Sequence, residues 1–295
     1  MLNARAGGAG KPVFETLEHR AKSAFAAHRI QTCIELVDGS QLKGAITRAL
    51  EQAKQGEIDA IVIGGGDGSV HTAASLLARS DVPLGVLPLG TLNHFAKDLG
   101  LPLDIESAAA VIARGRSRLV DLGKVNGETF VNNSSIGIYP YLVMDRERRR
   151  ARKRLRKWMA MVPAFFRMLR HLPWRRLRIS AEGFERPYRT PCVFVGNNEY
   201  GTDLFTLGRR RRLDTGKLWF YVVKPRSPLG LFWIACRMCF SHLDPEGDLD
   251  TFELSEAEIA AKSSRLPVAL DGEVRVLHTP LHYRSLPKAL RVIAP

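Results

Sequence analysis

A glycine-rich loop directly after an apolar run constrains the fold of this chain more than any other feature. The run "DAIVIG" (59–64) is apolar and rich in β-branched residues, which is typical of a buried parallel strand. Four glycines follow within "IGGGDGS" (63–69), and Ser69 can begin a helix as its N-cap. Because a strand, a glycine turn and a helix make one βα unit, the sequence predicts an α/β sheet here.

Alternating patterns on both sides of this loop extend the prediction to a doubly wound α/β domain. Apolar residues at helical spacing alternate with short β-type runs up to about residue 115. The expected helices are 13–30, 41–56, 69–80, 91–100 and 105–115, and the expected strands are 33–38, 59–64 and 83–90. From about residue 118 short β-type runs dominate, and Asn126-Gly127 between two of them signals a hairpin. We therefore expect an α/β domain over 1–122 and a mostly antiparallel β domain over 123–295.

A second loop of the same kind follows the next predicted strand. In "PLGTLNHFAKDLGLP" (88–102), Gly90 and Thr91 come after a strand, and Asn93 lies in the first turn of the following helix. Because loops after parallel strands lie at one edge of a sheet, the two loops are expected to wall one crevice.

Asp67, in the centre of the first loop, limits what that crevice can bind. Backbone N–H groups and a helix N-terminus favour an anion, but a carboxylate repels a bare phosphate. A divalent metal or a hydroxyl donor on a nucleotide would make the carboxylate acceptable. An ordinary tight turn is the plainer alternative, and three consecutive glycines before Asp-Gly argue against it.

Five segments, taken in order, resemble the diacylglycerol kinase catalytic-domain family, which includes bacterial diacylglycerol and sphingosine-type lipid kinases. They are "GGGDGS", "PLGTLNHFAKDLGLP", "VDLGKVNG…FVNNSSIGIY", "LDTGKLWFYVV" and "LDGE". The resemblance covers nearly the whole chain, although the GGDG motif is shared with NAD kinases. It implies an NAD kinase-like nucleotide domain, a β-sandwich lipid-substrate domain and an active site in the cleft between them. It also implies that the C-terminal segment can pack back on the first domain.

The resemblance implies a role for each motif residue. Asp271 of "LDGE" would be the general base that takes the proton of a lipid hydroxyl, with Glu273 beside it. Asp67 would bind Mg²⁺ with ATP, and Asp214 of "LDTG" would belong to a second, more structural metal site. The remaining nucleotide-binding residues would be Asn3, Gly65, Gly66, Gly68, Ser69, Gly90, Thr91, Asn93 and Asp121. Read without the resemblance, "LDGEV" is a β-turn with Asp-Gly at its corner.

Three departures from the family pattern bear on activity. Only Met1 and Leu2 precede Asn3, so either the start of the chain is assigned late or the first strand is truncated, which would weaken nucleotide binding. His94 stands where the family often has Asp, and Thr215 replaces a common second Asp in the metal loop. These differences leave open an inactive relative that only binds nucleotide.

One segment supplies nearly all of the positive charge. The chain carries a formal charge of +14, and residues 145–178 account for +12 of it. Within them, "RERRRARKRLRK" (146–157) leads directly into "WMAMVPAFF" (158–166). A cationic helix followed by Trp, Met and Phe is typical of an interfacial anchor. We expect a basic helical insertion over about 145–172, and docking on an anionic membrane through 146–170. A solvated helix face and core packing are the alternatives.

Composition narrows the function further. No secretory leader or membrane-spanning run is apparent, and four scattered cysteines do not form a disulfide framework, so a cytoplasmic location at the inner face of the membrane is expected. Outside the basic segment the chain is nearly neutral and has no nucleic-acid-reading motif, which argues against a nucleic-acid partner. The leading expectation is an ATP-dependent kinase of a lipid such as diacylglycerol or a sphingoid base. A soluble kinase of NAD kinase type is the alternative. The acceptor lipid and a homodimer both remain open.

Overall fold

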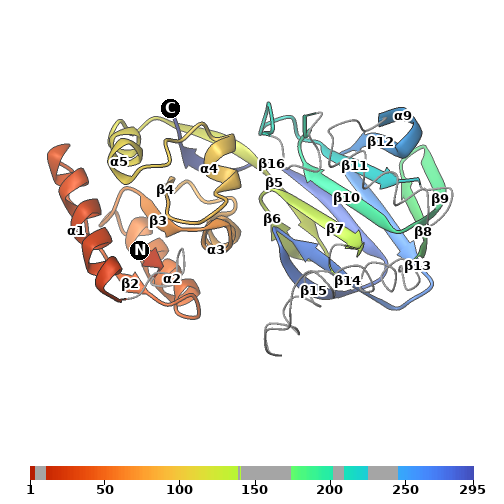
Figure 1. Cartoon of the computed structure of the whole chain (residues 1–295), viewed down its shortest axis with the longest axis horizontal. Coiled ribbons are helices and arrows are strands. Elements are labelled where there is room, and N and C mark those ends of the chain that lie inside the picture. Colours follow the sequence, from red (N-terminus) through yellow and green to blue (C-terminus); the bar gives the residue numbers. More distant parts are fainter. Residues whose placement is uncertain (4–10, 139, 141–173, 202–208, 225–244) are drawn as a thin grey trace, which may run out of the picture.

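The computed structural model describes residues 1–3, 11–138, 140, 174–201, 209–224 and 245–295. The predicted basic insertion (145–172) and the predicted membrane-docking segment (146–170) lie outside the described residues. The described residues form two sheets. A mixed sheet runs through both halves of the molecule, and an antiparallel sheet packs on its second half (Figure 1).

The first half is a parallel sheet with helices on both faces, as the alternating pattern predicts. Its strands have the order β2-β1-β3-β4, and each expected helix and strand forms within a few residues of its predicted bounds. The strands are β1 (Leu2–Asn3), β2 (Leu36–Val37), β3 (Ile61–Gly65) and β4 (Leu84–Pro88). The helices are α1 (Lys11–Ala27), α2 (Leu42–Lys54), α3 (Asp67–Leu77), α4 (His94–Asp98) and α5 (Ile105–Ala113).

Side chains of alternating direction on these strands fill two cores. Ile61 and Ile63 of β3 pack with the apolar residues of α2 and α3 on one face. Val62, between them, packs on the opposite face with residues of α1 and α5. Burial on both faces explains the continuous apolar run in the sequence. Because β3 and β4 are parallel, the turns that follow them lie at one edge of the sheet.

The second half is a β-sandwich. Its antiparallel sheet has the order β12-β11-β10-β7-β14-β15, and it covers the antiparallel part of the mixed sheet, β5, β6, β16, β13, β8 and β9. Buried side chains from both sheets, including Phe130, Phe220 and Tyr283, form the core between them. The strands are β5 (Ser117–Val125), β6 (Glu128–Phe130), β7 (Asn133–Gly137), β8 (Arg175–Ala181), β9 (Phe184–Thr190), β10 (Cys192–Asn197), β11 (Leu218–Val223), β12 (Leu249–Leu254), β13 (Glu256–Ala261), β14 (Arg265–Leu270), β15 (Glu273–His278) and β16 (Leu281–Ile293), and the short helix α9 (Pro245–Asp248) precedes β12.

Two long strands join the halves. The C-terminal end of β16 returns to the first half, where Val292 pairs in parallel with Leu84 of β4, while its beginning pairs with β13 in the sandwich. β5 pairs with β16 along most of its length, so the predicted division between residues 122 and 123 falls inside β5. The strands therefore hold the two halves together through continuous main-chain hydrogen bonds.

Local signals at this junction agree with the structure. Asn126 and Gly127 both have positive φ, as the two-residue turn between β5 and β6 requires, so the predicted hairpin is confirmed. In the part of the chain that the structure describes, no helix has the length and apolar character needed to cross a membrane.

Candidate active site

The turn after β3 presents free backbone donors at the start of α3. Helix α3 begins at Asp67, and its N-cap is Gly66, which has no side chain to cap the first N–H groups. The turn after β4 packs directly on it, because a Cβ on Gly90 would lie 2.4 Å from the Cα of Gly66. The two predicted glycine loops therefore meet backbone to backbone, as the walls of one crevice would.

The beginning of the chain reaches the same place. Although β1 is only two residues long, it pairs with both β2 and β3. The side-chain amide of Asn3, the last residue of β1, donates to the hydroxyl of Ser69 at 2.7 Å. A Cβ on Gly65 would lie 2.6 Å from the same hydroxyl oxygen, so only glycine fits there. Asn3, Gly65 and Ser69 thus lie together beside the first loop.

Asn93 serves the second loop in a way that the sequence does not reveal. It has a left-handed backbone (φ 51°), and its side chain is buried. Its Oδ1 accepts from the N–H of Gly90, and its Nδ2 donates to the carbonyl of Gly90. The side chain therefore shapes the loop instead of pointing freely into the crevice. Thr91, next to it, is exposed.

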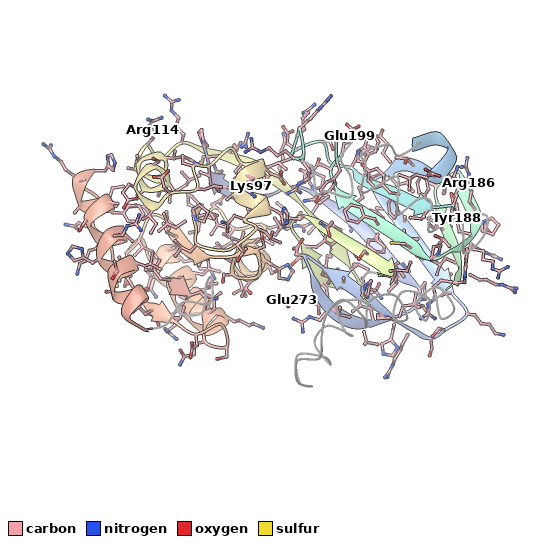
Figure 2. All side chains as sticks on the ribbon, viewed as in Figure 1. Lys97, Arg114, Arg186, Tyr188, Glu199 and Glu273 are labelled. Atoms are coloured by element: carbon pink, nitrogen blue, oxygen red, sulfur yellow. The ribbon has the colours of Figure 1, made fainter. Side chains whose placement is uncertain are left out.

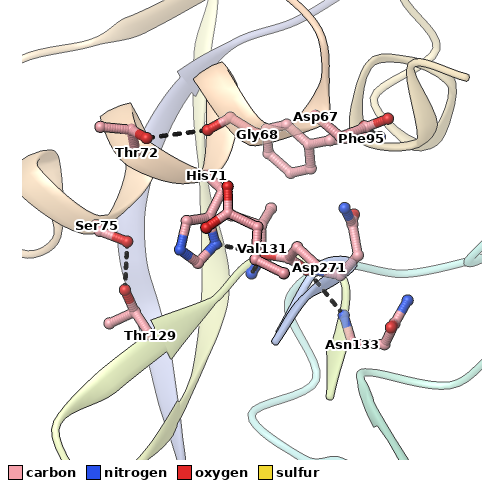
Figure 3. A network of polar contacts seen from close by, with 12 residues as sticks. Asp67, Gly68, His71, Thr72, Ser75, Phe95, Thr129, Val131, Asn133 and Asp271 are labelled. Carbon is pink, nitrogen blue, oxygen red and sulfur yellow. Dashed lines mark hydrogen bonds and ion pairs between the residues drawn. The ribbon is translucent and has the colours of Figure 1, made fainter. Parts of the chain in front are cut away.

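Asp67 lies between the two loops and is only partly covered. Its Oδ1 accepts from the N–H of Phe95, at the start of α4, over a long 3.4 Å (Figure 3). This weak contact leaves most of the acceptor capacity of the carboxylate available. A partly exposed carboxylate, free N–H groups and close-packed glycines fit a nucleotide phosphate chain with a divalent cation.

Asp271 comes from the turn between β14 and β15 and is held by main-chain donors. Its Oδ1 accepts from the N–H groups of Asn132 and Asn133 at 2.7 and 3.1 Å, and its Oδ2 accepts from the N–H of Val131 at 2.7 Å. Its backbone is left-handed (φ 47°), a conformation in which only Gly, Asn and Asp are common. The N–H of Asp271 donates to the carbonyl of Asn133 at 2.9 Å, which fixes the turn against the start of β7.

A histidine that the sequence analysis did not select completes this arrangement. Nδ1 of His71, in the second turn of α3, lies 2.7 Å from Oδ2 of Asp271 (Figure 3). Burial lowers the pKa of His71, but the hydrogen bond to Asp271 and the charges of Asp271 and Glu273 raise it, and the net pKa lies above the ordinary value. The pair connects the helix of the first glycine loop to the sandwich. The only signal in the sequence is its position, four residues after Asp67.

Glu273 lies beside the pair at the junction of the two halves (Figure 2). A Cβ on Gly68 would lie 3.5 Å from its Oε1, so the first turn of α3 and the start of β15 are close neighbours. The side chain is half exposed and forms an ion pair with Arg275 at 3.1 Å. Asp67, Gly68, Asp271 and Glu273 therefore surround one region, as the predicted site requires.

A buried arginine supports the donors that hold Asp271. Nε of Arg210 donates to Oδ2 of Asp98, at the end of α4, at 2.8 Å. Its Nη1 donates to the carbonyl of Val131 and its Nη2 to the Oδ1 of Asn132, both at 2.8 Å. The side chain is 0% exposed. Arg210 thus links the first half to Val131 and Asn132, two of the three residues whose N–H groups bind Asp271. The sequence, where Arg210 stands in "RRRR", does not distinguish it from its neighbours.

Two predicted acidic residues lie elsewhere. The buried Asp121 accepts from the N–H groups of Gly216 and Lys288 at 2.6 and 2.8 Å, and so ties a loop of the sandwich to the bulge of β16. The exposed Asp214 pairs with Arg212 at 3.1 Å. Among the described residues, no hydrogen bond joins either to the glycine loops, and no three His, Cys, Asp or Glu side chains gather as a metal site. The predicted metal roles of Asp67 and Asp214 stay predictions.

Residues 1–125, which contain both glycine loops, match the family model of the diacylglycerol kinase catalytic domain. Over these residues the chain is similar to that family. Curated proteins match this chain over different lengths and at different identities. A diacylglycerol kinase of Bacillus subtilis is 40% identical over 35% of this chain and 35% of its own length. An uncharacterised protein of Synechocystis is 26% identical over 85% of this chain and 59% of its own length. The chain thus spans less than two thirds of either relative.

Solved structures extend the likeness to the whole fold. The crystal structure of a putative diacylglycerol kinase from Bacillus anthracis aligns with 100% of this chain and 95% of its own, with a TM-score of 0.74 and 23% identity. Yeast NADH kinase aligns with 81% of this chain and 62% of its own, with a TM-score of 0.50 and 14% identity. At these identities the likeness establishes the fold, and the predicted NAD kinase-like domain with a β-sandwich is confirmed.

Proposed function

We propose that this protein is an ATP-dependent lipid kinase that transfers the γ-phosphate of ATP to the hydroxyl of a lipid such as diacylglycerol or a sphingoid base. The diacylglycerol kinase domain over 1–125 supports the class of reaction. The acceptor and the nucleotide belong to the proposal.

One contact carries this proposal. The carboxylate of Asp271 comes from the sandwich, and it meets His71 one turn into the helix that follows the first glycine loop. Transfer of a phosphoryl group to an alcohol needs anion-binding donors, a cation and a proton acceptor near the incoming hydroxyl. The glycine loops and Asp67 offer the first two, and the pair of Asp271 and His71 offers the third.

Residues of both glycine loops and of the acidic turn have a place in this function. The amides around Gly66 and Gly90 would hold the phosphates, with Asn3 and Ser69 shaping the loop, and Mg²⁺ bound at Asp67 would neutralise charge between the β- and γ-phosphates. The half-exposed Glu273 lies where a second carboxylate can orient the acceptor.

A turnover assay with labelled ATP and Mg²⁺ tests the proposal. Diacylglycerol and sphingoid bases in vesicles form the lipid arm, and NAD⁺ forms the second arm. We expect label in the lipid fraction only. Label in NADP⁺ would instead identify a soluble kinase of NAD kinase type. This alternative is tested because yeast NADH kinase has a similar fold. Binding of Mg-ATP without transfer to any acceptor would identify an inactive relative.

Association with an anionic bilayer is the second part of this proposal. Its support is the charge of +12 carried by residues 145–178, which include the run "WMAMVPAFF" (158–166). Each Lys or Arg near an anionic surface contributes about 1 kcal/mol. Cosedimentation with phosphatidylglycerol vesicles at low salt, and its loss with phosphatidylcholine or at about 0.5 M salt, is the expected result. Equal binding to both lipids would contradict an electrostatic anchor.

A further inference from the structure

The carboxylate of Asp271 has no acceptor site left for a substrate. A carboxylate has about four lone-pair positions. Here Oδ1 accepts from Asn132 and Asn133, and Oδ2 accepts from Val131 and faces Nδ1 of His71, so all four positions are taken. Three of these donors are main-chain N–H groups, which cannot move away without opening the start of β7.

The exposed fractions of the two side chains favour the histidine as the group that meets the substrate. The side chain of Asp271 is 1% exposed, whereas that of His71 is 15% exposed. A lipid hydroxyl that enters the crevice therefore reaches the imidazole ring more readily than the carboxylate.

The hydrogen bonding of His71 leaves a lone pair on its second ring nitrogen. Because an ionised carboxylate only accepts hydrogen bonds, Nδ1 must carry a proton to bind Asp271. Nε2 of the neutral ring is then unprotonated, and among the described residues nothing donates to it or accepts from it. This is the arrangement of a histidine base that is oriented by a buried carboxylate.

We propose that Nε2 of His71 takes the proton of the acceptor hydroxyl, and that Asp271 is a positioning residue which fixes the tautomer and the ring. This inference rests on the proposed kinase function. It changes which atom of the predicted site performs proton transfer.

The transfer balances in one step. The hydroxyl oxygen of the lipid forms a bond to the γ-phosphorus while the bond from that phosphorus to the β–γ bridging oxygen breaks. The hydroxyl proton passes to Nε2, and the imidazolium that results keeps its Nδ1–H on Asp271, whose negative charge stabilises it. The proton then leaves to solvent from the exposed side of the ring.

Charges around the ring set the pH at which it works. Asp271 and Glu273 face it from the turn and from β15 and raise its pKa, Arg275 of β15 lowers it, and burial lowers it. Since only the neutral ring accepts a proton, kcat is expected to rise as the pH increases through the pKa of His71.

Three variants test the assignment in the full chain. Asn in place of His71 keeps an N–H donor near the position of Nδ1 but has no base, so H71N keeps the contact with Asp271 and loses proton transfer. H71A removes both and leaves space for free imidazole. H282N is the matched control, because His282 also lies near a carboxylate, that of Glu258 at 3.5 Å, but is 64% exposed and pairs with β13 of the sandwich.

We expect H71N to lower kcat by about 10²-fold or more with the KM for ATP nearly unchanged, and to lose the rise of kcat with pH on the acidic limb of the profile. Added imidazole should restore part of the activity of H71A, and H282N should behave as wild type. If H71N keeps kcat within about threefold and keeps the pH profile, Asp271 is the base and the proposal is wrong.

A measurement without substrate makes the test independent of turnover. The ¹⁵N chemical shifts of the ring distinguish its tautomers, and we expect His71 to carry its proton on Nδ1 above its pKa. A proton on Nε2 in the neutral ring would overturn the proposal. Absence of any lipid-dependent turnover by the wild type, with the expected tautomer present, would instead refute the kinase function and this role with it.

Discussion

Two turns in the sandwich have nearly the same sequence and very different surroundings. "LDTG" (213–216) and "LDGE" (270–273) both place an aspartate after a buried leucine, before or beside a glycine. Asp214 is 46% exposed and pairs with its neighbour Arg212. Asp271 is 1% exposed and is bound by three main-chain N–H groups and a histidine from the other half of the molecule.

This difference shows where the chemistry of a carboxylate comes from. The contacts of Asp214 come from two residues away in the same loop, where solvent competes with them. Those of Asp271 come from the segment between β6 and β7, from the start of β7 and from α3, where burial makes each hydrogen bond worth more and each loss more costly. The following predictions test this contrast, from the largest expected effect to the smallest.

Replacing Asp271 by Asn should have the largest effect. The amide group turns an N–H donor toward groups that are themselves donors, and it no longer selects the Nδ1–H form of His71. We expect kcat to fall on the order of 10³-fold or more while Mg-ATP still binds, as measured by turnover and by equilibrium binding. Near-normal turnover of this variant would remove Asp271 from the site.

Replacing Arg210 by Met should cost the most stability. The change leaves Asp98 buried without its partner, and it removes the donors to Val131 and Asn132. We expect a loss of about 3–5 kcal/mol in the free energy of unfolding, measured by urea denaturation. Replacing the exposed Arg212 by Met is the control and should cost about 0–1 kcal/mol. Equal losses in the two variants would contradict the contrast between the turns.

The contact between His71 and Asp271 should make stability depend on pH. The folded pKa of His71 is raised above its ordinary value of 6.5, so protonation favours the folded state. Its contribution is fully present below the unfolded pKa and is lost as the pH rises through the folded pKa. Urea midpoints of wild type and H71N, measured from about pH 5 to 9, should therefore show a wild-type advantage that shrinks as the pH increases. A constant difference would mean that the ring does not titrate against Asp271.

Replacing Asp214 by Asn should have the smallest effect. An exposed ion pair between neighbours contributes little, so the free energy of unfolding should change by less than about 0.5 kcal/mol. Turnover should stay within about twofold of wild type. If Mg²⁺ raises the melting temperature of wild type but not of D214N, the metal site implied by the resemblance exists at this turn.

Local sequence patterns predict the two glycine loops, because a strand, several glycines and a helix start stand next to one another in the chain. Asp271 was selected only through the family resemblance, since "LDGEV" by itself is read as a β-turn. His71 and Arg210 could not be selected in this way. Arg210 stands among three other arginines and His71 belongs to no motif that the sequence analysis selected, so only the partners that folding brings to them set them apart.

Local sequence patterns also do not predict how the two halves assemble. The pattern changes from alternating helices and strands to β-type runs near residue 118, yet β5 begins there and pairs with β16 across both halves. Such pairing depends on the register between segments far apart in the chain. Local patterns likewise did not predict that Asp121 contacts Gly216 and Lys288, each far away in sequence, and its nucleotide-binding role stays a prediction.

The sequence by itself determined the βα units, the glycine turns after β3 and β4 and the hairpin at Asn126, because each depends on the periodicity and backbone preferences of adjacent residues. Only the tertiary structure decided which groups meet at the site. His71 and Asp271 are 200 residues apart, and their contact exists because β16 returns to the first sheet and packs the sandwich against α3. Local preferences act over a few residues, whereas such a contact depends on the burial and pairing of the whole chain.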